Sequence, residues 1–253
     1  MPAEGACRLP ERAVSPAFLR GEDGLLKDAR LSAASVRHGF TTRPLGDMAD
    51  PARRRAFFGS LGLKDETGLW LKQVHGDRVV RWPEDLASQG DGAPLRADGW
   101  IAAAPSRPLC VYTADCAPLL LWDATLRFGG VFHVGWRGAA AGLPRSAAAS
   151  LREAFGVRPA DLRACVGPHI RPCCFKVGPE VAERFNGRSV VERPGGPFVD
   201  LAGEIAAQLV EAGLDRASVA LSPECTCCRP EAFYSFRRDK ARDSLMAFLV
   251  LEP

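Results

Sequence analysis

Short apolar runs recur along the chain, and most of them are bounded by glycine, proline or polar residues. Runs of this length are typical of buried β-strands. The pattern predicts strands at Leu69–Leu71, Arg78–Trp82, Gly99–Ala103, Leu109–Thr113, Pro118–Trp122, Gly130–Val134, Leu162–Val166, Val219–Ser222, Phe233–Phe236 and Met246–Leu251.

Helical periodicity separates some of these strands. It predicts helices at Pro51–Leu61, Gly138–Phe155, Pro179–Phe185 and Leu201–Ala212. The second is long and alanine-rich, with Pro144 near its start, where proline is tolerated. Because strands outnumber helices and often follow one another directly, we predict an α/β fold with a mixed sheet. We expect one compact domain over residues 31–253, preceded by a loose, variable extension at residues 1–30.

Composition narrows the class of protein. The 253 residues carry a formal net charge of +3, which is too small a bias to indicate nucleic-acid binding. The N-terminus has no apolar core of signal-peptide length, and no apolar run approaches ~18 residues. We therefore expect a cytoplasmic protein that binds neither nucleic acid nor membrane, as a monomer or weak homodimer.

Nine cysteines are present, and without a secretion signal we expect free thiols or metal ligands rather than disulfides. Cys225 and Cys228 have the spacing of half a zinc ribbon, and the adjacent Cys173 and Cys174 could supply the other half. Adjacent cysteines are poorly suited to tetrahedral geometry, however. Buried free thiols are the default expectation for these residues.

Three candidate metal-binding side chains lie at or near the ends of predicted strands. His75 follows an apolar run, Cys116 stands in a polar turn between two strands, and His133 ends a strand just before a helix. Side chains from distant segments often converge at strand ends. Two imidazoles and one thiolate would suit Zn²⁺ and leave one position open. Taken alone, however, a histidine is more often an ordinary hydrogen-bonded residue than a metal ligand.

Eight strings along the chain resemble, in order, those of the YfiH family, also called the laccase-domain family. They are KQVHG, ADGWIA, TADCAPLLLWD, HVGWRG, GPHIRPCCFKVG, VDL, CTCC and FYSFRRD. The resemblance runs from about Phe40 to Lys240. It implies a compact α/β sandwich with mixed sheets, and it implies that His75, Cys116 and His133 bind zinc.

The same resemblance implies several activities. These are phosphorolysis of adenosine, inosine or methylthioadenosine, deamination of adenosine, and hydrolytic editing of peptidoglycan precursors. We expect a zinc-dependent purine nucleoside enzyme whose partners are a nucleoside and phosphate. The alternatives are a hydrolase that edits peptidoglycan precursors, a copper-binding polyphenol oxidase and a metal-binding regulatory protein. Four histidines are too few for a blue-copper centre plus a trinuclear cluster, so copper would act only as a substitute for zinc.

Other residues could complete this site. Arg137, at the predicted helix start, and Arg43 are candidate phosphate ligands, since guanidinium groups and helix N-termini favour anions. Trp136 is a candidate purine contact. Asp115 could be a general acid or base, or could orient a histidine.

Three further features leave alternatives open. Asp98 is a candidate turn cap, and His169 is interpreted as a loop residue rather than a further polar contact to the site. Residues 44–58 depart from the family pattern, being shorter and lacking an Asn-Leu pair. We expect this loop to cover the site and so to affect substrate preference.

Overall fold

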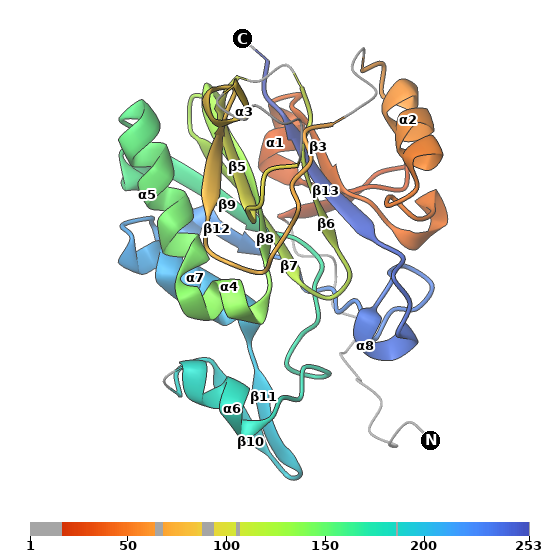
Figure 1. The fold of residues 1–253 in the computed structure, drawn as a ribbon, viewed down its shortest axis with the longest axis vertical. Helices are drawn as coiled ribbons and strands as arrows, with labels where there is room; N and C mark the ends of the chain where they lie inside the picture. The colour runs from red at the N-terminus through yellow and green to blue at the C-terminus, as the bar shows by residue number, and fades with distance from the viewer. Residues whose placement is uncertain (1–16, 64–67, 88–93, 105–106, 186, 253) are drawn as a thin grey trace.

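Two β-sheets form the centre of the computed structural model, which describes residues 17–63, 68–87, 94–104, 107–185 and 187–252 (Figure 1). The larger sheet has six strands in the order β12-β9-β7-β8-β5-β4. These strands span Val219–Leu221, Leu162–Val166, Ala117–Asp123, Phe128–Val134, Gly99–Ala103 and Val79–Trp82. The outer pairs are parallel and the central pairs antiparallel, so the sheet is mixed.

The second sheet is antiparallel throughout and has the order β1-β2-β3-β13-β6. Its strands span Phe18–Arg20, Leu26–Asp28, Arg37–Phe40, Leu245–Val250 and Leu109–Thr113. The hairpin of β10 (Val190–Arg193) and β11 (Gly196–Val199) stands apart at the lower end of the view in Figure 1, next to α6 (Pro179–Ala182).

Alternation along the strands explains why the sheets stack. In β7, Leu119 and Leu121 face one hydrophobic cluster and Leu120 and Trp122 face another, because successive side chains of a strand point to opposite faces. The second cluster also contains residues of β3, β6 and β13, so it lies between the two sheets. Burial on both faces accounts for the uninterrupted apolar run in this strand.

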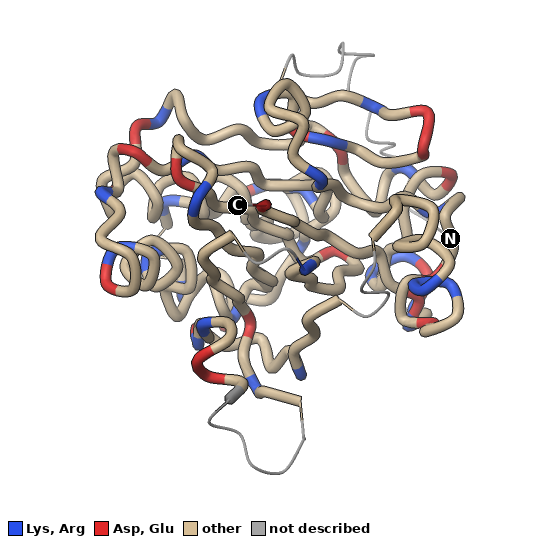
Figure 2. Tube along the Cα trace, turned by 90° about the horizontal axis from the view of Figure 1, so that it is seen from above, with Lys and Arg blue, Asp and Glu red and all other residues tan. Residues whose placement is uncertain are grey.

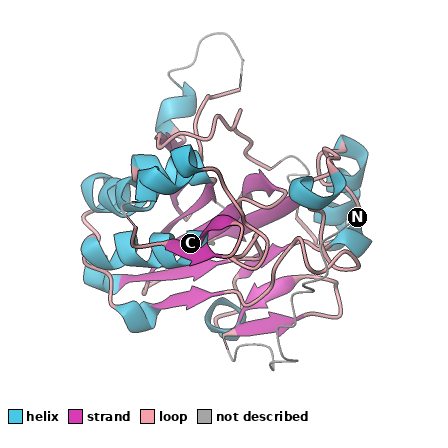
Figure 3. Ribbon diagram, turned by 90° about the horizontal axis from the view of Figure 1, so that it is seen from below, coloured by secondary structure: helices cyan, strands magenta, loops and turns pink. Residues whose placement is uncertain are grey.

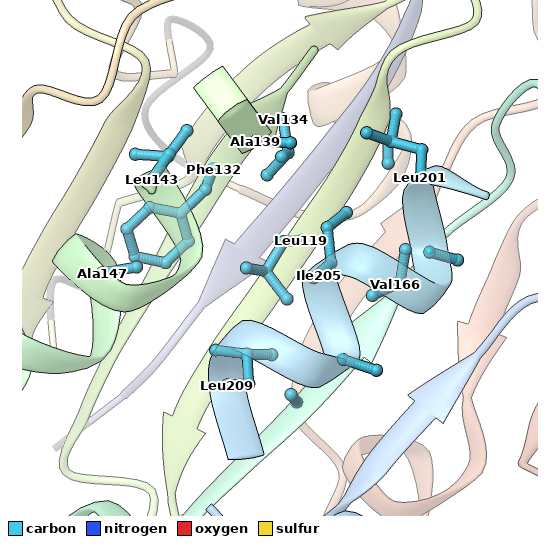
Figure 4. Close-up of a cluster of buried hydrophobic side chains, with 14 of the residues drawn as sticks. Leu119, Phe132, Val134, Ala139, Leu143, Ala147, Val166, Leu201, Ile205 and Leu209 are labelled. Atoms are coloured by element: carbon cyan, nitrogen blue, oxygen red, sulfur yellow. The ribbon is translucent and has the colours of Figure 1, made fainter. Parts of the chain in front are cut away.

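Helices cover the outer faces of the sheets, and Figure 3 shows them flanking the strands. α5 (Leu143–Phe155) and α7 (Leu201–Glu211) pack on the six-stranded sheet (Figure 4). α2 (Pro51–Ser60) packs Phe57 and Phe58 against the other sheet. The remaining short helices are α1 (Ala29–Ala33), α3 (Glu84–Ala87), α4 (Trp136–Ala141), α8 (Phe236–Asp239), η1 (Arg43–Leu45), η2 (Pro159–Asp161), η3 (Glu183–Phe185) and η4 (Arg216–Ser218).

The predicted mixed α/β fold with stacked sheets and flanking helices is confirmed, but several details were wrong. Residues 17–30, expected in a loose extension, form β1, β2 and the start of α1; residues 1–16 lie outside the described residues. The predicted helix Gly138–Phe155 is two helices, because Gly142 adopts a φ of 94° and Pro144 sits at the start of the second. Residues 233–236 are not a strand, since Ser235 caps α8.

Charges of both signs are scattered around the chain, as Figure 2 shows, in keeping with the small net charge. Among the described residues, no helix combines the length and apolar character needed to cross a membrane.

Candidate functional site

Strand register brings the three predicted metal ligands together. β7 and β8 pair antiparallel, with Pro118 opposite His133. Cys116 directly precedes β7, so it lies beside the end of β8 that carries His133. His75 lies on the loop before β4 and adopts a φ of 60°. The structure therefore unites residues that are far apart in the sequence.

The ligand atoms of His75, Cys116 and His133 all lie within 4.8 Å of one another. The two imidazole rings are nearly perpendicular, with centroids 4.7 Å apart. Gly135 permits this approach: a Cβ there would lie 3.0 Å from the His75 ring and 3.1 Å from the Cys116 sulfur. The close approach of both groups explains the glycine in the HVGWRG string.

Asp98 holds both the His133 side chain and the backbone of residues 74–76, and does not only cap a turn. Its carboxylate lies 2.9 Å from Nδ1 of His133 and accepts hydrogen bonds from the backbone amides of Val74, His75 and Gly76. Because Nδ1 is bonded to Asp98, Nε2 is the nitrogen of His133 that is available to a metal ion. Carboxylate–histidine pairs of this kind fix the ring and its tautomer in metal sites.

Electrostatic coupling between Cys116 and His133 favours the charged form of each side chain. Burial raises the pKa of the Cys116 thiol, but the charge of His133 and hydrogen bonds from His133 and His75 lower it to about 6. Burial lowers the pKa of His133, whereas the charge of Cys116 and the hydrogen bond to Asp98 raise it to about 9. Cys116 is thus a thiolate at neutral pH, the form that binds metals.

This coupling predicts the reactivity of the metal-free protein. After chelation, alkylation of Cys116 by iodoacetamide should be half-maximal near pH 6, because a lowered pKa keeps the thiolate above that pH and loses it below. An ordinary thiol titrates near ~8.5. Peptide mass spectrometry separates Cys116 from the other cysteines. A midpoint above pH 8 would contradict the coupling.

Asp98→Asn removes the charge behind His133 while preserving the size of the side chain. We expect the affinity of the site for a divalent metal ion to fall by roughly 10- to 100-fold, the usual cost of losing such a partner. Competition with a chromophoric chelator measures the affinity, and circular dichroism checks that the fold is retained. Unchanged affinity would show that Asp98 serves only the backbone of residues 74–76.

A cavity of about 570 Å³ opens beside His75 and Cys116, a volume within the range of small-molecule sites. Its walls combine aromatic, aliphatic and cationic side chains. The lining residues are His75, Ala114, Asp115, Cys116, Trp136, Ile170, Phe175, Leu201, Phe236, Arg237 and Lys240. Trp136 thus lies where the sequence placed it.

The cationic side chains of the cavity differ from those expected. Arg137 is exposed, with its guanidinium 4.3 Å from the centre of the Trp136 ring, and it does not line the cavity. Arg43 bonds the carbonyl of Pro230 and also lies outside. Arg237 and Lys240 line the cavity instead. The FYSFRRD string contains Arg237 but ends one residue before Lys240.

The long helix that supported Arg137 begins elsewhere. α5 starts at Leu143, and the helix next to His133, α4, spans only Trp136–Ala141. The helix that starts beside His133 is therefore a short one and not the predicted long one, and phosphate binding by Arg137 stays a prediction.

Asp115 lies on the cavity wall with a φ of 87°. One carboxylate oxygen accepts from the Thr226 hydroxyl at 2.6 Å and the other from the Arg237 amide at 2.7 Å. These bonds join the turn that carries Cys116 to the segment that carries Arg237. Asp98, not Asp115, orients a histidine; a role for Asp115 as general acid or base remains a prediction.

The other two histidines serve the fold. His38 accepts a hydrogen bond from the Asp28 amide, and His169 is buried with Nδ1 2.8 Å from the carbonyl of Gly167. Neither belongs to the metal-ligand group. Residues 44–58 were expected to cover the site, but none of them is among the residues that line the cavity.

Comparison with known proteins decides the family. The sequence model for multi-copper polyphenol oxidoreductase laccases matches residues 45–252. The chain belongs to this laccase-domain family, of the YfiH type. The purine nucleoside phosphorylase of Mycobacterium tuberculosis is 34% identical over 224 residues, covering 84% of this chain and 86% of that protein. The purine nucleoside phosphorylase YfiH of Shigella flexneri is 30% identical over 212 residues, covering 81% and 82%.

Solved structures share the fold. Hypothetical protein YfiH of Bacillus licheniformis superposes with a TM-score of 0.82 at 24% identity, covering 94% of this chain and all of that one. Protein NMB0706 of Neisseria meningitidis gives a TM-score of 0.71 at 25% identity, covering 94% of this chain and all of that one.

The donor set fits one metal ion rather than several copper ions. Of the four histidines, two lie at the site and two are held elsewhere in the fold. Two imidazoles and a thiolate match three-ligand catalytic zinc sites. A trinuclear copper cluster needs more imidazoles than this site has, despite the description that the family carries.

Proposed function

We propose that the protein is a zinc-dependent purine nucleoside phosphorylase. The main evidence is the composition of one cavity. It is lined by two potential metal ligands, His75 and Cys116, and also by Arg237, Lys240 and several aromatic side chains. A purine nucleoside and a phosphate ion need an apolar surface for the base and positive charge for the anion. The names of the relatives support the same reading.

His75, Cys116 and His133 would hold the metal, and Asp98 would keep His133 in the binding tautomer. When bound, Zn²⁺ supplies a Lewis acid that stabilises negative charge developing beside it. These residues suit Zn²⁺ because the pKa of the Cys116 thiol is lowered and because the Asp98 carboxylate bonds the His133 imidazole.

The remaining residues would bind and orient the reactants. Trp136, Phe175 and Phe236 offer flat apolar surfaces to the purine. Arg237 and Lys240 would hold phosphate beside the anomeric carbon of the ribose. There one phosphate oxygen forms a bond to the carbon as the bond to the purine nitrogen breaks, and the electron pair leaves with the base. Holding both reactants in this geometry lowers the barrier by proximity.

Product analysis tests the proposal. Zinc-loaded protein is incubated with adenosine or inosine, with and without phosphate, and the products are separated by chromatography. We expect release of adenine or hypoxanthine that depends on phosphate. Base release without phosphate would indicate hydrolysis, and inosine from adenosine would indicate deamination. Either result alone would replace phosphorolysis, and no reaction with any nucleoside would leave a different substrate class for the cavity.

A further inference from the structure

Four cysteines outside the candidate active site form a second compact group of sulfur atoms. Their Sγ atoms all lie within 4.8 Å of one another. The sulfur of Cys228 lies 3.6 Å from that of Cys173 and 3.3 Å from that of Cys174. We call this group the four-cysteine cluster; its members are Cys173, Cys174, Cys225 and Cys228.

The fold supplies the cluster from two loops that follow parallel strands. β9 and β12 pair in parallel, so the loops after them leave the same edge of the sheet. A bridge between His169 and Cys225 aligns these loops, and the Thr226 amide donates to the carbonyl of His169. Residues 173 and 228 thus meet across 54 intervening positions.

Adjacent cysteines such as Cys173 and Cys174 are usually poorly suited to tetrahedral coordination, but local turns bring their sulfur atoms together here. The amides of Cys174 and Phe175 both donate to the carbonyl of Arg171, so the chain curls at this point. On an extended strand, neighbouring side chains would point to opposite sides; on this turn both reach Cys228. The Cys225–Cys228 segment turns in the same way. The expectation of buried free thiols was wrong in part, since only Cys225 of the four is fully buried.

The sulfur separations distinguish between two kinds of link. Disulfide-bonded sulfurs lie about 2.05 Å apart, whereas the separations of 3.3 and 3.6 Å exclude a disulfide between Cys228 and either Cys174 or Cys173. Tetrahedral zinc with Zn–S bonds of about 2.3 Å requires sulfurs about 3.8 Å apart. The cluster is therefore close to the arrangement that a tetrathiolate metal site needs.

Charge around the cluster also suits a metal. Four thiolates and one Zn²⁺ carry a net charge of −2. Guanidinium groups surround both loops: Arg171 donates to the carbonyl of Pro223 at 2.7 Å, Arg237 to that of Cys174 at 3.3 Å, and Arg238 to that of Cys227 at 3.0 Å. Nearby positive charge stabilises such an anionic centre.

We propose that the four-cysteine cluster binds a second Zn²⁺, which is structural and distinct from the metal at His75, Cys116 and His133. Four sulfur ligands leave no open coordination position, as in other structural zinc sites. Soft thiolates select zinc or iron over hard cations, and the proposal commits to zinc.

This metal would fix the wall of the cavity. The first loop carries Ile170 and Phe175, which line the cavity. The second loop carries Thr226, whose hydroxyl donates a hydrogen bond to Asp115, another residue that lines the cavity. Loss of the second zinc should therefore lower thermal stability and loosen the cavity, without removing the ligands of the first.

Metal analysis of the full chain tests the proposal. Protein purified under reducing conditions from zinc-supplied cells should contain two zinc ions per chain by plasma mass spectrometry. Cys228→Ser should lose one and should melt at a lower temperature. Cys227→Ser is the matched control, since Cys227 lies in the same turn but outside the cluster; it should keep both ions.

The ligands can be identified without relying on a variant of the cluster. Cys116→Ser should retain one zinc, and X-ray absorption at the zinc edge should find four sulfurs at about 2.3 Å and no imidazole. This measurement stands even if Cys228→Ser fails to fold, and it does not depend on the proposed enzymatic activity. Absence of zinc from Cys116→Ser, a disulfide within the cluster under reducing conditions, or iron in place of zinc would overturn the proposal.

Discussion

Replacing Cys116 by serine should remove the metal of the candidate active site and nearly all nucleoside phosphorolysis together. A serine hydroxyl does not ionise near neutral pH, whereas the neighbouring imidazoles lower the pKa of the Cys116 thiol to about 6. Charge stabilisation by a bound metal contributes several kcal/mol to a transition state, so we expect a loss of activity on the order of 10³-fold. Initial rates with inosine and phosphate measure it.

His75→Ala should behave in the same way, because His75 lies in the same ligand group. Cys227→Ser controls for the loss of a thiol, since Cys227 is not in either group of potential ligands. If Cys116→Ser kept its activity at full zinc occupancy of the site, the metal centre would lie elsewhere.

Lys240→Met should raise the phosphate concentration that the enzyme requires by roughly 10- to 100-fold. A charge-assisted hydrogen bond is worth about 1.5–3 kcal/mol, and tenfold corresponds to about 1.4 kcal/mol. Lys240 lines the cavity and is exposed, so its removal should disturb the fold little. The apparent KM for phosphate should rise while the KM for inosine stays nearly constant.

Two arginines sharpen this test. Arg152→Ala is the matched control for loss of a cation, because Arg152 lies on the exposed face of α5, where its guanidinium pairs with Glu153. Arg137→Ala separates the structural assignment from the sequence-based one. A larger rise in the phosphate KM for Arg137→Ala than for Lys240→Met would show that the anion binds on the outer side of Trp136.

The convergence of three potential metal ligands could be predicted from the sequence, whereas the cationic wall could not. His75, Cys116 and His133 each stand at a strand end within a specific string, and strand register brings such positions together. Arg237 reaches the cavity only because residues 233–240 turn back past Asp115, whose carboxylate bonds the Arg237 amide. No local pattern predicts a contact across 122 positions.

The fold, like the site, contains elements that the sequence predicted and elements that it did not. Strands with two buried faces, such as β7, were recognised from their apolar runs. Edge strands such as β1 and the hairpin β10–β11 were missed, because they are short and mix exposed with buried residues. The break at Gly142 was missed because helical periodicity continues across it; the φ of 94° needs glycine, and Pro144 marks the new start. Cys173 and Cys174 were expected to be poorly suited to tetrahedral coordination because they are adjacent. The turn at Arg171 brings both sulfurs to the same side of the chain, and the sequence pattern does not reveal that turn.

Formation of ribose 1-phosphate tests the central claim most directly. Chelated protein should make none from inosine and phosphate, and zinc added until both proposed sites are filled should restore a yield equal to the hypoxanthine released. The Cys116→Ser protein treated identically should stay inactive. Ribose 1-phosphate formation that survives complete chelation, or base release with free ribose as the sugar product, would contradict a zinc-dependent phosphorylase at this site.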